Sequence, residues 1–81
     1  MKRTQTPASE TIRSIGYRLP SRELELEFRE TGDLYRYSEV SPEEHAEFMA
    51  APSKGIHLNQ VFKGREHPYR IVRRGKRSRA A

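Results

Sequence analysis

LYRYSEVSPEEHAEFMAAPSKGIHLN, residues 34–59, is the stretch of this 81-residue chain that decides its fold. It opens with a Tyr-x-Tyr strand and continues directly into a helix start. Ser41 is the expected N-cap, Pro42 occupies the first helical position, and Glu44 is the capping-box acid three residues after the cap. The stretch therefore predicts a strand followed at once by a well-capped helix.

Two further signals divide the residues after this helix start. Pro52 is predicted to end the first helix, because the residue before a proline avoids the helical conformation. Ser53 can then cap a second helix, which Gly64 is placed to stop. The apolar side chains of that second helix recur at helical spacing, at Leu58, Val61 and Phe62.

Upstream of this stretch the apolar period is two, which is typical of strands. Residues 12–19 and 22–29 both alternate, and the second segment places Leu24, Leu26 and Phe28 on one face against glutamates on the other. Helix propensity favours a Glu/Leu segment as a helix, but the alternating pattern indicates a half-buried strand. Gly32 lies in the predicted hairpin turn before a third strand at 34–37, where it can take a positive φ.

These elements predict a small α+β domain. We expect a three-stranded antiparallel meander followed by two short helices that pack on one face of the sheet. Residues 1–9 are polar and predicted to be disordered, residues 10–72 form the domain, and residues 73–81 form a basic disordered tail. Residues 69–72 are expected to lie as an extended segment against the sheet.

The charge of the chain is divided unevenly along its length. Residues 1–53 hold seven Lys or Arg and ten acidic residues, whereas residues 54–81 hold nine Lys or Arg and one acidic residue. Such asymmetry fits an anionic partner such as nucleic acid, or equally a tail that only keeps the protein soluble. The chain has no cysteine and no apolar run long enough to cross a bilayer, so we expect a cytoplasmic protein without a membrane partner.

The sequence gives little indication of catalysis or of a bound metal. His45, His57 and His67 are spaced too widely for a helical zinc pair, and we expect the first on a helix face and the others near the surface. The glutamates at 23, 25 and 27 belong to the solvent face of a strand. We therefore expect no catalytic residue, no metal site and no cofactor, and interpret the chain as a non-enzymatic protein.

Binding is the more plausible activity. Tyr35 and Tyr37 put two rings on one strand face, where they could stack unpaired bases, or could instead pack as core residues beneath the helices. The acidic face of the second strand favours placing nucleic acid on the side of the second helix and the C-terminus. The candidate nucleic-acid-binding residues are Lys54, Lys63, Arg65, Arg70, Arg73, Arg74, Tyr35, Tyr37 and Asn59.

The order of these features resembles the KTSC domain family, a small domain named for lysyl-tRNA synthetase C-termini that also occurs as stand-alone bacterial proteins. The resemblance covers roughly residues 9–71 and is carried by Ile15-Gly16-Tyr17, Leu24-Glu25-Leu26-Glu27-Phe28, Tyr35-Arg36-Tyr37, Val40, Ser53-Lys54-Gly55 and Asn59. His57-Leu58 departs from the Tyr-Phe that is common in the family before the asparagine. RNA binding is proposed for this family, so the resemblance implies a small α+β fold with RNA as the expected partner.

Two functions remain open from sequence. The first is an RNA-binding module that contacts tRNA or a single strand. The second is a protein-interaction or adaptor module whose basic tail is solubilising. The open edges of a small sheet allow dimerisation by strand pairing, and the sequence does not predict the oligomeric state.

Overall fold

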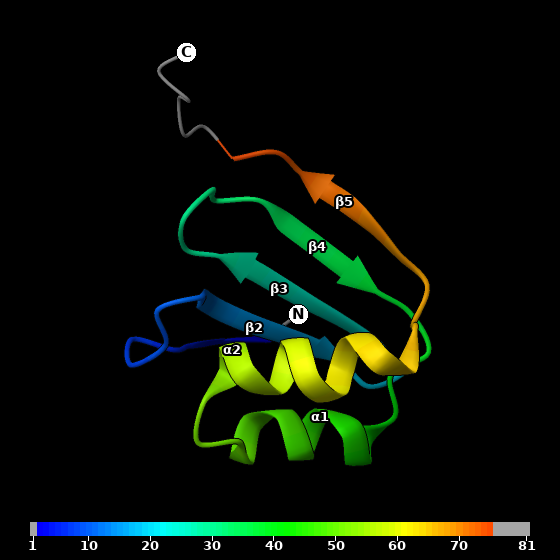
Figure 1. Ribbon diagram of the computed structural model, residues 1–81. Helices are drawn as coiled ribbons and strands as arrows, with labels where there is room; N and C mark the ends of the chain where they lie inside the picture. Colours follow the sequence, from blue (N-terminus) through cyan, green and yellow to red (C-terminus); the bar gives the residue numbers. More distant parts are fainter. Residues whose placement is uncertain (1, 76–81) are drawn as a thin grey trace.

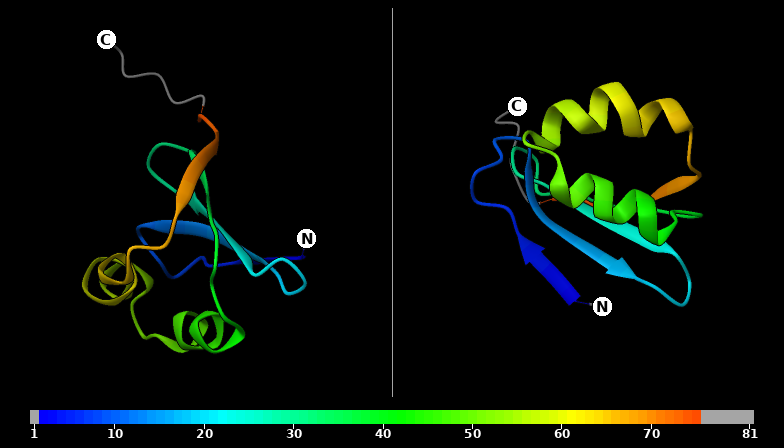
Figure 2. Two further views of the ribbon diagram at one scale, coloured as in Figure 1. Left: turned by 90° about the vertical axis from the view of Figure 1, so that its right-hand side faces the viewer. Right: turned by 90° about the horizontal axis from the view of Figure 1, so that it is seen from below.

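A computed structural model of the protein describes residues 2–75. The elements follow one another as β1 (Lys2–Gln5), β2 (Ile12–Arg18), β3 (Glu23–Phe28), β4 (Leu34–Tyr37), α1 (Pro42–Ala50), α2 (Lys54–His57), η1 (Leu58–Phe62), η2 (Lys63–Arg65) and β5 (Tyr69–Arg73). The strands form one antiparallel sheet in the order β1-β2-β3-β4-β5. The helices lie together on one face of this sheet (Figures 1 and 2).

The α+β class and the helices on one sheet face are confirmed, but the prediction of three strands was too small. β1 lies inside residues 1–9, which were expected to be disordered. Its sequence Lys-Arg-Thr-Gln has no apolar alternation, so its pairing with β2 depends on backbone hydrogen bonds that leave no pattern in the sequence. β5 includes the expected extended segment 69–72 and also Arg73, which was assigned to the tail. Residues 76–81 of the predicted tail lie outside the described residues.

The start of α1 follows the sequence signals closely. Ser41 Oγ accepts a hydrogen bond from the backbone N–H of Glu44 at 3.1 Å, and the Glu44 side chain accepts one from the backbone N–H of Ser41 at 3.3 Å. This capping box satisfies two backbone donors that a helix start otherwise leaves unpaired. The predicted end before Pro52 is also confirmed, since α1 ends at Ala50.

The second helical segment ends differently from the prediction. α2 continues as a π-helical turn, η1, and then as a 3₁₀ turn, η2, so helical backbone reaches Arg65 and passes through Gly64. The residue that terminates it is Glu66, which takes the left-handed conformation with φ 54° and donates its N–H to the Lys63 carbonyl. Gly64 was therefore the wrong stop signal, because a glutamate supplies the left-handed cap in its place.

The hydrophobic core lies between the helices and the sheet. The fully buried side chains come from β2, β3, the β4–α1 connection and both helical segments, and the largest are Phe48, Phe62, Ile12, Ile15, Leu24, Leu26, Leu58 and Val40. His57 is buried with them, edge-on to Phe48 with ring centroids 4.8 Å apart. Its expected position near the surface was wrong. Among the described residues its Nε2 atom has no hydrogen-bond partner.

The opposite face of the sheet carries a row of charged side chains. The register places Arg3, Gly16, Glu25, Arg36 and Arg70 side by side across all five strands. Because Gly16 has no side chain, the Arg3 guanidinium reaches across β2 to Glu25 at 2.8 Å. Glu25 also accepts two hydrogen bonds from Arg36, at 2.6 and 2.8 Å, and is only 6% exposed. The expected solvent face is therefore an ion-paired surface in which one carboxylate is buried.

No helix in the described part of the chain is long and apolar enough to cross a membrane.

Candidate nucleic-acid interface

The candidate binding residues do not form one site, because the fold separates them into three places. Tyr35, Tyr37 and Lys63 line a recess beside β5. Arg70 and Arg73 belong to the last strand, and Arg74 follows it. Of the other three residues, Lys54 and Asn59 line a second recess beside the β1–β2 connection. Arg65 lies in η2 close to Lys63 but does not line the first recess.

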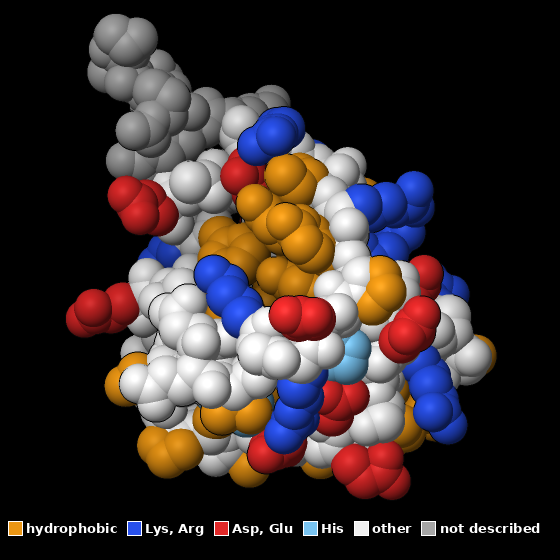
Figure 3. Space-filling model, turned by 45° about the vertical axis from the view of Figure 1, so that its right-hand side comes forward, with side chains coloured by type: hydrophobic (Ala, Val, Ile, Leu, Met, Phe, Trp, Pro, Cys, Tyr) orange, Lys and Arg blue, Asp and Glu red, His pale blue; other side chains and the backbone are white. Residues whose placement is uncertain are grey.

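The recess beside β5 is the most aromatic of these places. It has a volume of about 720 Å³ and is lined by Tyr35, Tyr37, Phe62, Lys63, Glu66, His67, Pro68 and Tyr69. Figure 3 shows hydrophobic side chains gathered on this side of the molecule between charged ones. The tyrosines come from β4 and β5, on the sheet face that the helices also occupy, and the other lining residues come from the end of the second helical segment and the connection to β5. We call this site the tyrosine recess.

The three tyrosine rings of the recess contact one another. Tyr35 stacks with Tyr69 at a centroid distance of 5.5 Å and an interplanar angle of 18°, and Tyr37 lies 5.4 Å from Tyr69. Tyr37 is 6% exposed, whereas Tyr69 is 60% exposed. Tyr37 therefore belongs to the core, which was one of the two alternatives that the sequence left open for Tyr35 and Tyr37. Tyr69 presents a ring surface to solvent.

Burial raises the pKa of Tyr37 to about 12, and the neighbouring Tyr35 and Tyr69 add to the rise. The hydroxyl therefore stays protonated in the folded protein at a pH where it ionises in the unfolded chain, whose ordinary value is 10.0. The difference between the folded and the unfolded pKa of Tyr37 stabilises the folded protein. This stabilisation is fully present below pH 10 and is lost as the pH rises through the folded pKa.

We expect an ultraviolet titration of tyrosinate to include a step near pH 12 that Tyr37→Phe removes, in addition to the step of Tyr17, whose pKa is also raised by burial. The same variant should resist alkaline unfolding better than the wild-type protein, because it has no hydroxyl that ionises on unfolding. Tyr69→Phe, which removes the hydroxyl of an exposed side chain, serves as the control: it should keep the step near pH 12 but move it to a slightly lower pH, because Tyr69 adds to the rise of the Tyr37 pKa. A step near pH 12 that survives in Tyr37→Phe would contradict the assignment.

Beneath the recess, three charged or polar side chains connect the second helical segment to α1. Glu44 accepts hydrogen bonds from His67 Nε2 at 2.8 Å and from Arg65 at 3.0 Å. Burial acts to raise the pKa of Glu44, but the donors from His67, Ser41 and Arg65 together lower it. Arg65 also bonds Glu47 at 3.1 Å. Arg65 is thus engaged by two carboxylates of α1 and does not face the tyrosine recess as a free cation.

The arginines of the C-terminal strand lie toward the other sheet face. Arg70 is the β5 member of the charged row, and Arg73 forms an ion pair of 3.3 Å with Glu27. Arg74 lies 3.8 Å from Asp33, which also accepts a hydrogen bond from the Gly75 N–H at 2.7 Å. Within residues 2–75, three of the six candidate cations form no ion pair with a carboxylate, namely Lys54, Lys63 and Arg70.

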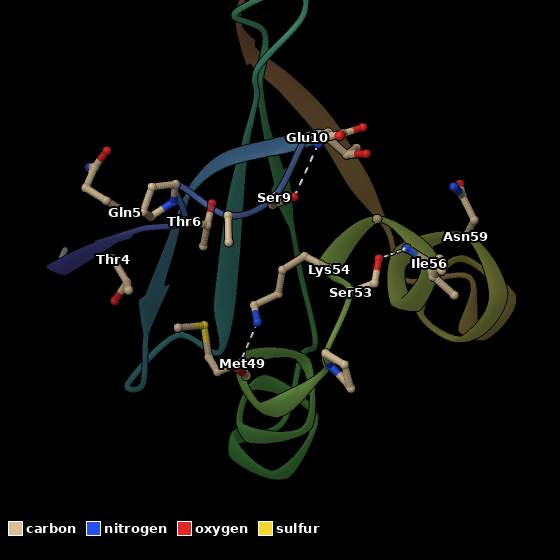
Figure 4. A pocket seen from close by; sticks show the side chains of 15 residues that line it. Thr4, Gln5, Thr6, Ser9, Glu10, Met49, Ser53, Lys54, Ile56 and Asn59 are labelled. Carbon is tan, nitrogen blue, oxygen red and sulfur yellow. Dashed lines mark hydrogen bonds between the residues drawn. The ribbon is translucent and has the colours of Figure 1, made fainter.

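The second recess separates Lys54 and Asn59 from the tyrosines. It measures about 650 Å³ and lies between residues 4–11 and the junction of the two helical segments. Lys54 Nζ donates to the Met49 carbonyl at 3.0 Å (Figure 4) and to the Ala51 carbonyl at 2.9 Å, so it completes the C-terminal end of α1. A cation at a helix C-terminus is a structural role, because it satisfies the exposed carbonyls there.

A close backbone approach shapes this second recess. A Cβ on Gly55 would lie 2.6 Å from Thr11 Oγ1, so glycine lets the helix start pack directly against the connection between β1 and β2. Ser53 caps the same helix start through its side-chain oxygen, which accepts from the Ile56 N–H at 3.3 Å. The Ser53-Lys54-Gly55 motif is therefore explained by packing and capping.

The three histidines are each held in a structural position. His45 stacks on Tyr17 at a centroid distance of 4.3 Å, and burial lowers its pKa. His57 lies in the core, and His67 bonds Glu44. No group of three histidine and acidic side chains in residues 2–75 is placed to hold a metal ion.

Tyr69 is the residue of this site that the sequence analysis did not include. It was assigned only to the extended segment 69–72, in which it precedes Ile71 and Val72. The signal that could have identified it is the alternation of Tyr69 and Ile71, which puts both on the face of Tyr35 and Tyr37 once the segment pairs as a strand.

Comparisons with known proteins agree with this architecture. The family profile described as the KTSC domain matches residues 8–65. An uncharacterized protein of Stutzerimonas stutzeri (strain A1501) is 44% identical over 69 residues, which are 85% of this chain and 94% of that protein. A lysine–tRNA ligase of Nostoc punctiforme is 34% identical over 59 residues, which are 73% of this chain but only 10% of the ligase.

A solved structure of a KTSC domain protein from Yersinia pestis has the same fold. It aligns with a TM-score of 0.80 at 39% sequence identity, and the alignment covers 89% of this chain and 97% of that one. The match over most of the chain, together with this shared fold, shows that the chain belongs to the KTSC domain family.

Proposed function

We propose that this domain is a non-catalytic binding module that takes up single-stranded RNA at the tyrosine recess. The observation that carries the proposal is the ring of Tyr69, which is 60% exposed and stacked on Tyr35. Single-stranded nucleic acids are commonly held by aromatic side chains on which unpaired bases stack, and any base offers a suitable face. Tyr35 supports the exposed ring from below, so the platform is already ordered before a base arrives.

Charge around the recess suits a phosphate backbone. Lys63 lines the recess, and Arg70 lies on the other side of β5. Neither forms an ion pair with a carboxylate inside the described range 2–75, so both can exchange counterions for phosphates. A strand that stacks one base on Tyr69 and crosses the edge of β5 would meet these two cations in turn.

The comparisons favour RNA over DNA as the ligand. A segment similar to this chain occurs in a lysine–tRNA ligase, a protein that acts on tRNA. The segment is a tenth of that protein, so the likeness supports RNA as a class of ligand and does not extend the ligase activity to this chain.

Lys63→Glu is expected to weaken the binding of a short fluorescent single-stranded RNA by about tenfold at low salt, since it reverses a charge beside the stacked base. The slope of log affinity against log salt should fall by about one. Arg13→Glu is the matched control, because it makes the same charge change at an exposed position of β2 away from the recess. Fluorescence anisotropy measures both.

Equal losses in Lys63→Glu and Arg13→Glu would mean that binding follows net charge alone and would contradict a site at the recess. Tyr69→Ala adds a test of stacking, which is worth about 1–3 kcal/mol per base. Absence of binding to the wild-type protein at low salt would overturn the RNA proposal and leave the protein-interaction function, which the exposure of β5 favours.

A further inference from the structure

The proposed RNA site uses side chains of β5, whereas the backbone along the outer edge of this strand offers a second binding capacity. In the part of the chain that the structure describes, β5 is the last strand of the sheet and its one partner is β4. Four of its five residues are exposed, and they include Tyr69 at 60% and Val72 at 39%. A strand in this position presents a row of unpaired backbone N–H and C=O groups to which another strand can pair.

We propose that β5 accepts an added strand from another protein, namely an extended acidic segment in which carboxylate and apolar side chains alternate. This interaction surface goes beyond the proposed RNA binding and does not depend on it. Its main-chain hydrogen bonds would extend the sheet, and the two faces of β5 would select the side chains.

The alternation follows from the two faces of β5. Tyr69 and Ile71 lie opposite Tyr37 and Tyr35, so the side chains of an added strand that point to this face would lie beside the tyrosine recess and should be apolar. Arg70 lies on the other face, opposite Arg36. The carboxylate of Glu25 is already bonded by Arg3 and Arg36, so Arg70 has no carboxylate partner within residues 2–75. Side chains that point to this face should therefore be acidic.

The charge of the two sheet edges argues against a second copy of this chain as the occupant. Residues 69–74 contain three arginines and no acidic residue, so two β5 strands would oppose like charges. The other edge, β1, carries Arg3 and has no acidic residue in its sequence. Basic edges of this kind resist pairing with each other and attract an acidic segment.

The test uses the labelled full-length protein and a synthetic peptide, Thr-Glu-Val-Glu-Phe-Glu-Thr. Two control peptides replace each Glu by Lys, or keep the composition but group the acids as Glu-Glu-Glu-Val-Phe-Thr-Thr. Amide hydrogen exchange followed by NMR reports whether the outward amides of β5 become protected. We expect protection only with the alternating acidic peptide, and on β5 rather than on β1.

Two variants identify the contact and separate it from RNA binding. Arg70→Glu should lower the affinity for the alternating peptide by at least about tenfold. Arg13→Glu, on the interior strand β2, should lower it by less than about twofold. Lys63→Glu should lower the affinity for RNA but change the affinity for the peptide by less than about twofold, since Lys63 belongs to η2 and not to the edge strand.

Three results would overturn the proposal. They are equal binding of the lysine peptide, β5 amides that stay unprotected when the acidic peptide binds, and a protein that is already dimeric through β5 in the absence of peptide. If the peptide does not bind, the RNA titration can still show binding at the tyrosine recess. If RNA does not bind, the peptide can still protect the β5 amides. The two proposals can therefore fail separately.

Discussion

Phe62→Ala is expected to lower the free energy of unfolding by about 3–5 kcal/mol, which is a large part of the stability of a domain of this size. The Phe62 side chain is 1% exposed and stands where the helices, β4 and the tyrosine recess meet. Its ring contacts Tyr37 at a centroid distance of 5.0 Å, Phe48 at 5.4 Å and His67 at 4.8 Å. Truncation removes buried apolar surface and leaves a cavity beneath the recess.

Urea unfolding followed by circular dichroism measures this loss. Val61→Ala is the matched control, because Val61 precedes Phe62 in the same helical turn but is only half-buried, so it should cost about 1 kcal/mol. If Phe62→Ala does not fold, Phe62→Leu provides the measurement, with an expected loss of about 1–2 kcal/mol. A Phe62→Leu protein as stable as the wild type would show that the ring contacts do not stabilise the domain.

Glu25→Gln is expected to be the most damaging polar substitution, with a loss of about 2 kcal/mol. Glu25 is 6% exposed and bonds the guanidinium groups of Arg3 and Arg36. Neutralising it leaves two arginines facing each other over a partly buried position. Because these arginine side chains are 29% and 27% exposed, water relieves part of the cost and the loss stays below that of a fully buried pair.

Glu23→Gln provides the comparison. Glu23 lies on the same strand and face, but its one hydrogen-bond partner within residues 2–75 is the exposed Ser21 hydroxyl, at 3.1 Å. Its expected effect is below about 0.5 kcal/mol. Thermal and urea unfolding of both variants measures the two losses of stability. Similar small effects from the two substitutions would mean that the Arg3–Glu25–Arg36 cluster adds nothing to stability.

The parts of the fold that were predictable are those in which a local pattern and the tertiary packing agree. The alternation of Leu24, Leu26 and Phe28 matched the buried face of β3, and the Ser41 capping box matched the start of α1. The hairpin glycine, Gly32, takes the expected positive φ of 78°. In each case the residue types needed by the local backbone are the same ones that the core needs.

The parts that were not predictable depend on distant partners. β1 is polar along its length, and Arg3 finds its partner Glu25 on a strand that is not its neighbour. The burial of His57 depends on the packing of Phe48 against the second helical segment, which no local pattern encodes. Departures of this kind come from tertiary contacts that outweigh propensity.

The candidate site was predicted only in part for the same reason. Tyr35 and Tyr37 were placed on a common face because strand alternation is local. The sequence did not indicate which cations are free to bind a ligand. Arg65 forms ion pairs with α1 and Arg73 with β3, through contacts between residues distant in sequence. Lys63 remains beside the tyrosines, whereas Lys54 serves the end of α1.

The order of the strands in the sheet also has a consequence for how the chain folds. β1, β2 and β3 each pair with the next strand in sequence through short connections, whereas β5 reaches β4 only after both helical segments. Short loops lose less entropy on closing, so hairpins between β1 and β4 can form early and the pairing of β5 comes late. During synthesis β5 also emerges after its partner strand and the helices. We therefore expect β4 to be a temporary edge of the nascent sheet, protected from other chains only when β5 docks.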